Sequence, residues 1–232
     1  MDLAAEVSKD EYRQRLDRGQ ARLRQLSVVA REQGVSTVLA FEGWDAAGKG
    51  GSIRRLTQAM AARDYRVIPI AAPNAHELAH HYLWRFWRHL PRAGRMLIFD
   101  RSWYGRVLVE RVEGYAREDE WRRAYEEIVE FEQQLVERGM VLEKFWLHID
   151  AQEQLKRFEA REKTPYKKYK ITDDDYRNRG RWDDYAVAID EMVARTNVAG
   201  ARWNLVAAND KRHARLTILE TVCDALERRL EG

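Results

Sequence analysis

The chain has 232 residues, of which 45% are hydrophobic and 34% are charged. A chain of this size can bury a full core, so we expect one α/β domain over residues 1–232 with an appended segment, and not two domains. The formal net charge is only +3, so local patches of charge are more informative than the total. The first residues lack a basic stretch followed by an apolar one, and no apolar run is long enough to cross a bilayer. We therefore expect a cytoplasmic protein.

Helical and strand patterns alternate along the chain. A helical stripe over residues 9–33 ends at Gly34, immediately before a short β-rich run. We expect strands at 36–42, 65–70, 95–99, 141–149 and 203–208, and helices at 9–33, 52–60, 77–89, 118–138, 151–163, 182–196 and the C-terminal end. The single cysteine, Cys223, is in phase with leucines of that last helix, so we expect a packed thiol. Strands separated by helices predict a three-layer α/β/α domain with a parallel sheet of about five strands, whose ligand crevice lies at the carboxyl ends of the strands.

The stretch from Gly43 to Gly50, GWDAAGKG, fits the phosphate-loop spacing G-x-x-x-x-G-K and lies between a predicted strand and a predicted helix. In this motif backbone N–H groups cradle phosphate oxygens and the lysine, here Lys49, neutralises them. The usual next residue is Ser or Thr, whose hydroxyl holds Mg²⁺, but here it is Gly50. Asp45, inside the loop, is placed where it could serve the metal instead. The loop therefore predicts a phosphoryl-transfer site; the alternative is a glycine-rich turn that binds no ligand.

A second motif follows the apolar run Met96–Phe99, which ends in Asp100. A phosphate-loop enzyme needs its second magnesium ligand at the end of such a strand. Asp45 and Asp100 would then offer two charged oxygen ligands to a cation that keeps several waters. Arg101 and Arg106 come next, and guanidinium groups bind phosphate oxygens bidentately. The alternative is an aspartate that caps the next helix, followed by two solvated arginines.

The third feature is a segment from Arg161 to Arg181 in which lysines and arginines are interleaved with tyrosines. It has the position of the lid in nucleotide kinases, and we place a helical lid at about 161–185. The segment has more cations than one nucleotide needs, which indicates a longer polyanion. Because Ile171 is its only large aliphatic residue, we expect the lid to be mobile without ligand. There are two alternatives: the segment is a solvated charged face, or it binds a nucleic-acid backbone.

The loop 43–51, the run Asp100–Arg106 and the residues Glu162–Pro165 together resemble the polyphosphate kinase 2 family, and the similarity covers nearly the whole chain. The resemblance implies a phosphate-loop kinase fold like that of thymidylate kinase. It also implies transfer of a terminal phosphoryl group between inorganic polyphosphate and a nucleotide, with Mg²⁺ as cofactor and Mn²⁺ as the alternative ion. The run 106–114 resembles the subgroup that phosphorylates AMP to ADP, whose members often carry two fused copies of this domain. We expect a homo-oligomer, a dimer or tetramer, without nucleic-acid or membrane partners.

Residue roles follow from the motifs and from the resemblance. Catalytic roles are expected for Asp45, Lys49, Asp100, Arg101 and Arg161, and the metal ligands among them are Asp45 and Asp100. Phosphate or polyphosphate binding is expected for Gly43, Ala46, Ala47, Gly48, Lys49, Gly50, Gly51, Arg54, Arg101, Arg106, Lys163 and Lys167. Nucleotide binding is expected for Asp45, Trp103, Tyr104 and Arg106.

Three other functions remain open on these residues. The chain could phosphorylate nucleoside diphosphates from polyphosphate, act as an ATP-dependent nucleoside monophosphate kinase, or bind polyanions without turnover. A zinc protease is a further alternative, because His76 to His80 match H-E-x-x-H. Pro73 and Asn74 place His76 at the start of a helix, and the aromatic residues that follow suit packing, so we favour the packed helix.

Overall fold

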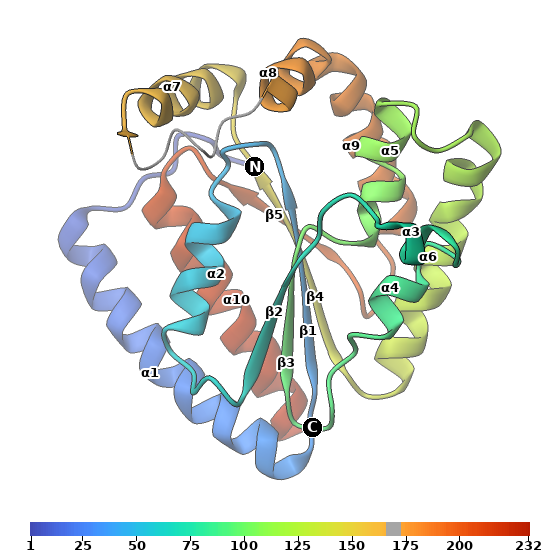
Figure 1. Cartoon of the computed structure of the whole chain (residues 1–232). Coiled ribbons are helices and arrows are strands. Elements are labelled where there is room, and N and C mark those ends of the chain that lie inside the picture. The colour runs from blue at the N-terminus through green and yellow to red at the C-terminus, as the bar shows by residue number, and fades with distance from the viewer. Residues whose placement is uncertain (166–172) are drawn as a thin grey trace.

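Five parallel strands form one sheet in the order β2-β3-β1-β4-β5 (Figure 1). The computed structural model describes residues 1–165 and 173–232. The strands are β1 (Thr37–Gly43), β2 (Tyr65–Pro69), β3 (Met96–Asp100), β4 (Val141–His148) and β5 (Trp203–Ala207). The predicted sheet is confirmed. Because β1 lies between β3 and β4, the carboxyl end of β1 has a neighbouring strand end on each side.

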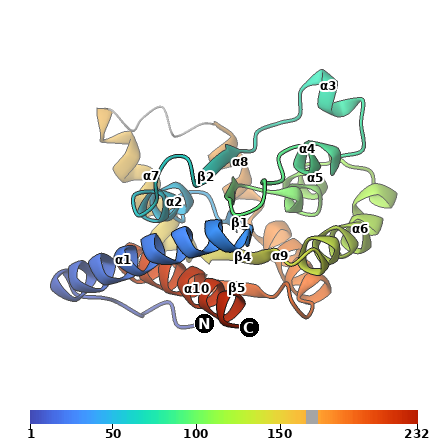
Figure 2. The same ribbon diagram turned by 90° about the horizontal axis from the view of Figure 1, so that it is seen from below.

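Helices cover both faces of this sheet, as Figures 1 and 2 show. One face carries α1 (Lys9–Gln33), α2 (Lys49–Thr57) and α10 (Lys211–Glu231), and the other carries α6 (Glu118–Glu137) and α9 (Trp182–Thr196). Beyond the carboxyl ends of the strands lie α7 (Ala151–Glu162) and α8 (Asp173–Gly180). The three-layer prediction is confirmed. None of the helices described is both long enough and apolar enough to span a bilayer.

Local signals explain the ends of α1. The Ser8 side chain accepts a hydrogen bond from the Glu11 backbone N–H at the first turn, as a capping residue does. Gly34 ends the helix in the left-handed region, at φ 72°, which costs glycine little. The predicted boundaries of α1 are therefore confirmed.

The single helix expected over 77–89 is wrong. The structure has two short helices there, α3 (Ala75–Leu78) and α4 (Trp84–Trp87). Asn74 and Glu77 form a capping box that starts α3, whereas Leu78 is 70% exposed and Leu83 and Phe86 are buried. The apolar stripe does not continue from one helix to the other, so packing does not hold them in line.

The Cys223 thiol is fully buried, as predicted, and it lies 3.7 Å from the Gly19 carbonyl oxygen. Burial raises the pKa of this thiol to about 12. Since the thiolate is the reactive form, we expect no reaction of the native protein with a disulfide reagent at pH 8, and one reacting thiol per chain in denaturant. Rapid labelling of the native protein would contradict this burial.

Candidate active site

The phosphate loop runs from the end of β1 to the start of α2 and makes a close approach to β4. Gly43 has φ 151°, and a Cβ there would lie 2.5 Å from the Leu147 carbonyl oxygen, so no larger residue fits without moving the strand. Gly48 has φ 111° at the N-cap of α2, and Ala46 adopts φ 64°. A non-glycine residue in this region is uncommon and marks strained, functional backbone.

Lys49 points back into the loop. Its Nζ donates to the carbonyl oxygens of Gly43 at 2.6 Å and Trp44 at 3.3 Å. Burial lowers the pKa of Lys49, while the charges of Asp45, Glu42 and Asp100 oppose that shift. The Lys49 ammonium group is therefore held by carbonyl oxygens of the loop itself and is influenced by the charges of these carboxylates.

Arg101 joins the loop to the end of β3. Its Nη2 lies 3.3 Å from Asp45 Oδ1, and its backbone is left-handed at φ 68°. Desolvation lowers the pKa of Arg101, but Asp45, Glu42 and Asp100 raise it by more. The structure therefore brings Asp45, Lys49, Asp100 and Arg101 together, as the motifs predicted.

The surroundings of Gly50 indicate which residues could hold Mg²⁺ in place of the usual hydroxyl. A Cβ at Gly50 would lie 3.9 Å from Asp100 Oδ2, so the hydroxyl of an ordinary phosphate loop would sit beside this carboxylate. Asp45 and Asp100 are hard oxygen ligands of the kind that Mg²⁺ accepts together with water and substrate oxygens. Over residues 1–165 and 173–232, no three His, Cys, Asp or Glu side chains converge on one point. These residues fit a cation that completes its shell with phosphate and water.

Two positioning residues were not foreseen. Glu42 is buried at the end of β1 and accepts hydrogen bonds from the backbone N–H and the hydroxyl of Ser102, at 2.7 and 2.8 Å. Burial raises the pKa of Glu42. The bonds to Ser102 fix the turn that presents Asp100 and Arg101. In the sequence, Glu42 could have been noticed because it is a charged residue at the end of the apolar run of β1.

Arg157 is the second such residue, and its side chain is only 4% exposed. Its Nη1 donates to the carbonyl oxygens of Ala46 and Ala47 at 2.9 and 3.0 Å. Its Nη2 donates to those of Ala208 and Asn209, at 2.7 and 2.8 Å. Arg157 thereby holds the phosphate loop against the segment after β5.

The nucleotide contacts expected for Trp103 and Tyr104 are not supported. Both side chains are buried, at 1% and 0% exposure, and both donate to Glu132 Oε1, at 3.0 and 2.7 Å. They lie in the turn η1 (Trp103–Arg106), which directs them into the core behind the site. A nucleotide contact by either ring does not fit this burial.

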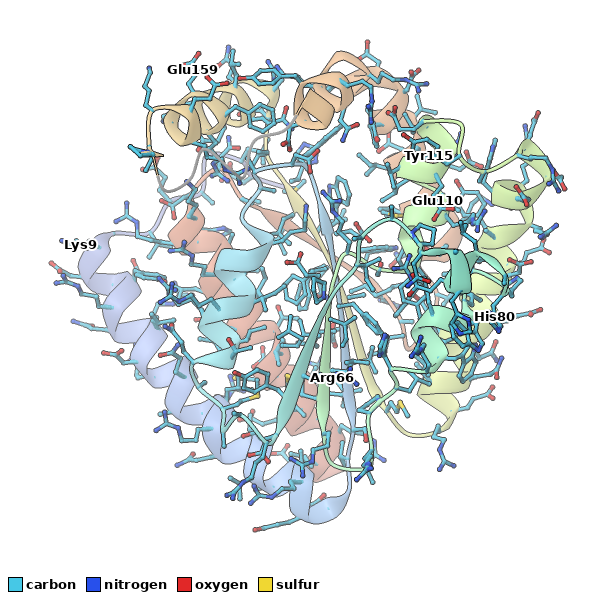
Figure 3. All side chains as sticks on the ribbon, viewed as in Figure 1. Lys9, Arg66, His80, Glu110, Tyr115 and Glu159 are labelled. Carbon is cyan, nitrogen blue, oxygen red and sulfur yellow. The ribbon has the colours of Figure 1, made fainter. Side chains whose placement is uncertain are left out.

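The remaining predicted cations are spread around the site. Arg106 faces α5 (Val109–Val112): its Nε lies 3.2 Å from Glu110 Oε2 and its guanidinium lies 4.5 Å above the Tyr82 ring. Figure 3 labels Glu110 at α5. Arg54 is exposed on α2, Arg161 lies in the last turn of α7, and Lys163 is its exposed C-cap. Lys167 lies outside the described residues.

A cluster of cations from α7 and α10 adjoins the loop and was not predicted in full. A Cβ at Gly51 would lie 3.2 Å from Arg215 Nη2. Burial lowers the pKa of Lys211; the charges of Arg157, Arg215 and Arg161 lower it further, and the charge of Glu153 opposes them. Lys211, Arg161 and Arg215 thus lie close enough to influence one another near the first turn of α2, which suits a polyanion. Arg157 is engaged with Glu153 and with backbone carbonyl oxygens.

The described arginines of the segment predicted to be a lid contact protein groups. Arg177 Nε donates to Glu113 at 3.1 Å, and Arg181 lies 3.9 Å from the same carboxylate. Arg179 donates to the Ala151 carbonyl oxygen at 2.7 Å. These side chains hold α8 and the start of α9 in place beyond the carboxyl ends of the strands.

The H-E-x-x-H residues are engaged in local structure. The His80 ring stacks on Trp84 at 4.1 Å, and its Nδ1 lies 2.8 Å from the His76 carbonyl oxygen. Glu77 closes the capping box and lies 3.3 Å from Arg85. Figure 3 shows His80 beside α3 and α4, apart from the phosphate loop. These local contacts do not make a packed helix, because α3 buries no residue and both histidines are exposed, so the expectation of a packed helix is wrong here.

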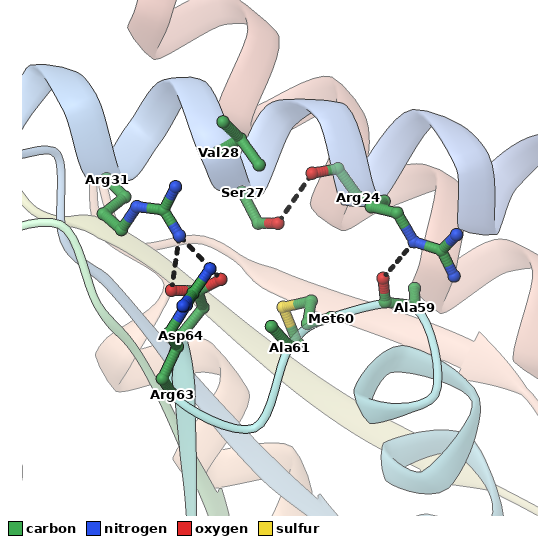
Figure 4. A pocket seen from close by; sticks show the side chains of 9 residues that line it. All are labelled: Arg24, Ser27, Val28, Arg31, Ala59, Met60, Ala61, Arg63 and Asp64. Atoms are coloured by element: carbon green, nitrogen blue, oxygen red, sulfur yellow. Dashed lines mark hydrogen bonds and ion pairs between the residues drawn. The ribbon is translucent and has the colours of Figure 1, made fainter.

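A groove of about 390 Å³ lies between α1 and the segment that joins α2 to β2 (Figure 4). Arg31 Nη1 donates to Asp64 at 3.1 Å, and Arg24 Nε donates to the Ala59 carbonyl oxygen at 3.1 Å. These contacts tie α1 to the segment before β2. Its lining residues between Ala59 and Asp64 come directly before the amino end of β2.

A lysine-bearing loop after the first strand, with a carboxylate at the end of the neighbouring strand, defines a phosphate-loop protein. A family model of polyphosphate kinase 2 matches residues 6–231. The chain therefore belongs to the polyphosphate kinase 2 family, and the predicted resemblance is confirmed.

Several relatives of known name or structure are similar to this chain. The polyphosphate:AMP phosphotransferase of Pseudomonas aeruginosa is 55% identical over 227 residues, which are 98% of this chain and 46% of that protein. ADP-polyphosphate phosphotransferase 2 of Rhizobium meliloti is 44% identical over 183 residues, 79% of this chain and 60% of that protein. The crystal structure of polyphosphate kinase 2 from Arthrobacter aurescens has a TM-score of 0.94 at 33% identity, covering 98% of this chain and 84% of that one. The chain spans about half the length of the polyphosphate:AMP phosphotransferases that it matches.

Proposed function

We propose that this chain transfers the terminal phosphoryl group of inorganic polyphosphate to AMP and so forms ADP. The observation that carries the proposal is the grouping of Asp45, Asp100 and Arg101 around Lys49, beside a cluster of cations larger than one nucleotide needs. It occurs in a chain that is 55% identical to a polyphosphate:AMP phosphotransferase over 98% of its length.

The donor lies on the phosphate loop in this proposal. Backbone N–H groups at the start of α2 and the Lys49 ammonium hold its terminal phosphates, and Arg215, Lys211 and Arg161 bind the phosphates that follow. Arg157 and Glu42 keep the loop and the β3 turn in register, since an in-line transfer depends on positioning.

The acceptor phosphate lies near Arg101, which donates to it bidentately and stabilises charge as the phosphoryl group moves. Asp45 and Asp100 would hold Mg²⁺, which neutralises phosphate charge when bound. Closure of α7 and α8 over the crevice excludes water, so the phosphoryl group passes to the nucleotide and not to a water molecule.

A second candidate acceptor is a nucleoside diphosphate, because ADP-polyphosphate phosphotransferase 2 of Rhizobium meliloti is 44% identical to this chain. The test compares AMP, ADP and GDP as acceptors at fixed polyphosphate and Mg²⁺, with products separated by anion-exchange chromatography. We expect kcat/KM for AMP to exceed that for either diphosphate by about 10-fold or more, which corresponds to about 1.4 kcal/mol. A higher value for ADP or GDP would overturn AMP as the acceptor.

Salt dependence tests the placement of the donor. Because a polyanion releases counterions when it binds several cations, we expect KM for polyphosphate to rise steeply with salt, and that for AMP to rise much less. Arg215→Gln should reduce this slope. Arg212→Gln serves as the matched control, because Arg212 lies on the same helix and pairs with Asp210 at 3.6 Å. Equal slopes in wild type and Arg215→Gln would place the donor elsewhere.

A further inference from the structure

The lid helix α8 places one neutral polar side chain against a carboxylate of the site. Asn178 Nδ2 donates to Asp45 Oδ2 at 3.2 Å, although 133 residues separate the two in sequence. The other oxygen of Asp45 lies 3.3 Å from Arg101 Nη2. One oxygen of Asp45 is thus held by the β3 turn and the other by the lid, which Figure 1 shows above the strand ends.

The Asp45 carboxylate sets the orientation of the Asn178 amide. An ionised carboxylate can only accept, so the amide nitrogen faces Asp45 and the amide oxygen faces the other way. The Tyr185 hydroxyl lies 3.4 Å from this amide oxygen and 3.3 Å from Glu113 Oε1, and its single proton can go to either one.

Contacts on both sides hold Asn178 in this place. Glu113, whose side chain is 6% exposed, accepts from Arg177 and lies near Arg181 at the end of α8. On the other side, the Trp182 indole stacks on Trp44 of the phosphate loop, at 3.7 Å between ring centroids and 6° between planes. The junction of α8 and α9 is therefore fixed between the end of α5 and the loop itself.

The hydrogen-bond donor to Asp45 is a neutral amide, and this bears on cation binding. Arg101 already lies 3.3 Å from one oxygen of Asp45. An arginine or lysine in place of Asn178 would add a second positive charge that repels a metal cation, whereas an amide holds the carboxylate without adding charge. A hydrogen bond of this kind to a ligating carboxylate fixes its orientation, and its loss typically costs 10- to 100-fold in metal affinity.

We propose that Asn178 is a positioning residue: when α8 closes, it fixes the Asp45 carboxylate in the orientation that receives the divalent cation. Closure of the lid and completion of the cation site are then one event. The effect expected on ADP formation rests on the proposed function. The effect expected on cation binding does not, because cation binding is measured without polyphosphate or nucleotide.

The test uses Asn178→Ala and Mn²⁺ alone, with binding followed by electron paramagnetic resonance. We expect the Mn²⁺ dissociation constant to rise by about 10-fold or more. In ADP formation, the Mg²⁺ concentration for half-maximal rate should rise similarly, and KM for polyphosphate should change by less than about 2-fold. Tyr176→Phe is the matched control: it lies on the same helix, and its hydroxyl bonds to Glu162 at 2.7 Å, so its loss should leave Mn²⁺ binding unchanged.

A double-mutant cycle separates positioning from simple attachment of the lid. In an Asp45→Asn background, Asn178→Ala should have little further effect on Mn²⁺ binding, because its target is already lost. Wild-type Mn²⁺ affinity in Asn178→Ala, or an equal loss in Tyr176→Phe, would overturn the proposal. Failure of the AMP assay alone would contradict the proposed function and leave the Mn²⁺ result standing.

Discussion

Replacing Asp45 or Asp100 by asparagine should lower the rate of ADP formation by on the order of 10²-fold or more, with the fold intact. Both carboxylates influence Lys49 and Arg101, and in the proposed function both would hold the cation beside the acceptor phosphate. Loss of preorganised charge at such a place costs several kcal/mol of transition-state stabilisation. Initial rates at saturating polyphosphate, AMP and Mg²⁺ measure the effect, and thermal unfolding checks the fold.

Asp183→Asn is the control for this substitution. Asp183 lies exposed in the first turn of α9, so the same loss of charge there should leave the rate within about 2-fold of wild type, as is usual for surface changes. Wild-type turnover by Asp45→Asn would remove Asp45 from the catalytic assignment.

The second large effect concerns stability. Lys144 and Glu132 form an ion pair at 2.7 Å, and neither side chain is exposed. Lys144 Nζ also donates to Tyr104 OH and to the Thr196 carbonyl oxygen, each at 2.8 Å. Removing one partner leaves the other charge buried, so we expect Lys144→Met to lower the free energy of unfolding by about 3–5 kcal/mol. Urea denaturation followed by circular dichroism measures it.

Two further variants make this prediction specific. Lys156→Met removes a lysine that is 80% exposed and lies 3.5 Å from Glu153, and such a pair contributes about 0–1 kcal/mol. The double variant Glu132→Leu, Lys144→Met should be more stable than Lys144→Met alone, because it removes the orphaned charge. If Lys144→Met lowers the free energy of unfolding by less than about 1 kcal/mol, the buried ion pair does not stabilise this part of the core.

The features that could be predicted from the sequence are local or periodic. The apolar runs of β1 and β3 end in charged residues, which placed both strands and their functional ends. The phosphate-loop spacing placed Lys49, and the parallel topology then implied that Asp100 lies beside it, since strand ends in such a sheet share one edge. The ends of α1 follow from its capping residues.

The features that could not be predicted depend on contacts between distant segments. Arg157 reaches the phosphate loop from 110 residues away in sequence, and nothing in its own helix distinguishes it from a surface arginine paired with Glu153. The same holds for Lys144, which occupies a strand position that alternation alone does not identify as buried. Trp103 and Tyr104 point inward because a tight 3-10 turn sets their direction, and a motif does not reveal that direction.

The segment predicted to be a lid shows most clearly which contacts cannot be predicted from the sequence. A basic segment predicts contacts with phosphate, but Arg177 and Arg181 meet Glu113, which lies in another part of the sequence. Asn178 carried no signal at all. Its position over Asp45 follows from the packing of the α8–α9 junction, which only the folded chain defines.

The most direct test of the account is to supply the purified chain with AMP and Mg²⁺ and either long-chain polyphosphate or ATP, and to measure ADP by chromatography while following the loss of polyphosphate. With polyphosphate, we expect one ADP for each terminal phosphate removed. With ATP alone, we expect a rate lower by at least about 10-fold, equivalent to about 1.4 kcal/mol in the barrier. Rapid ADP formation with ATP, together with no consumption of polyphosphate, would contradict the account.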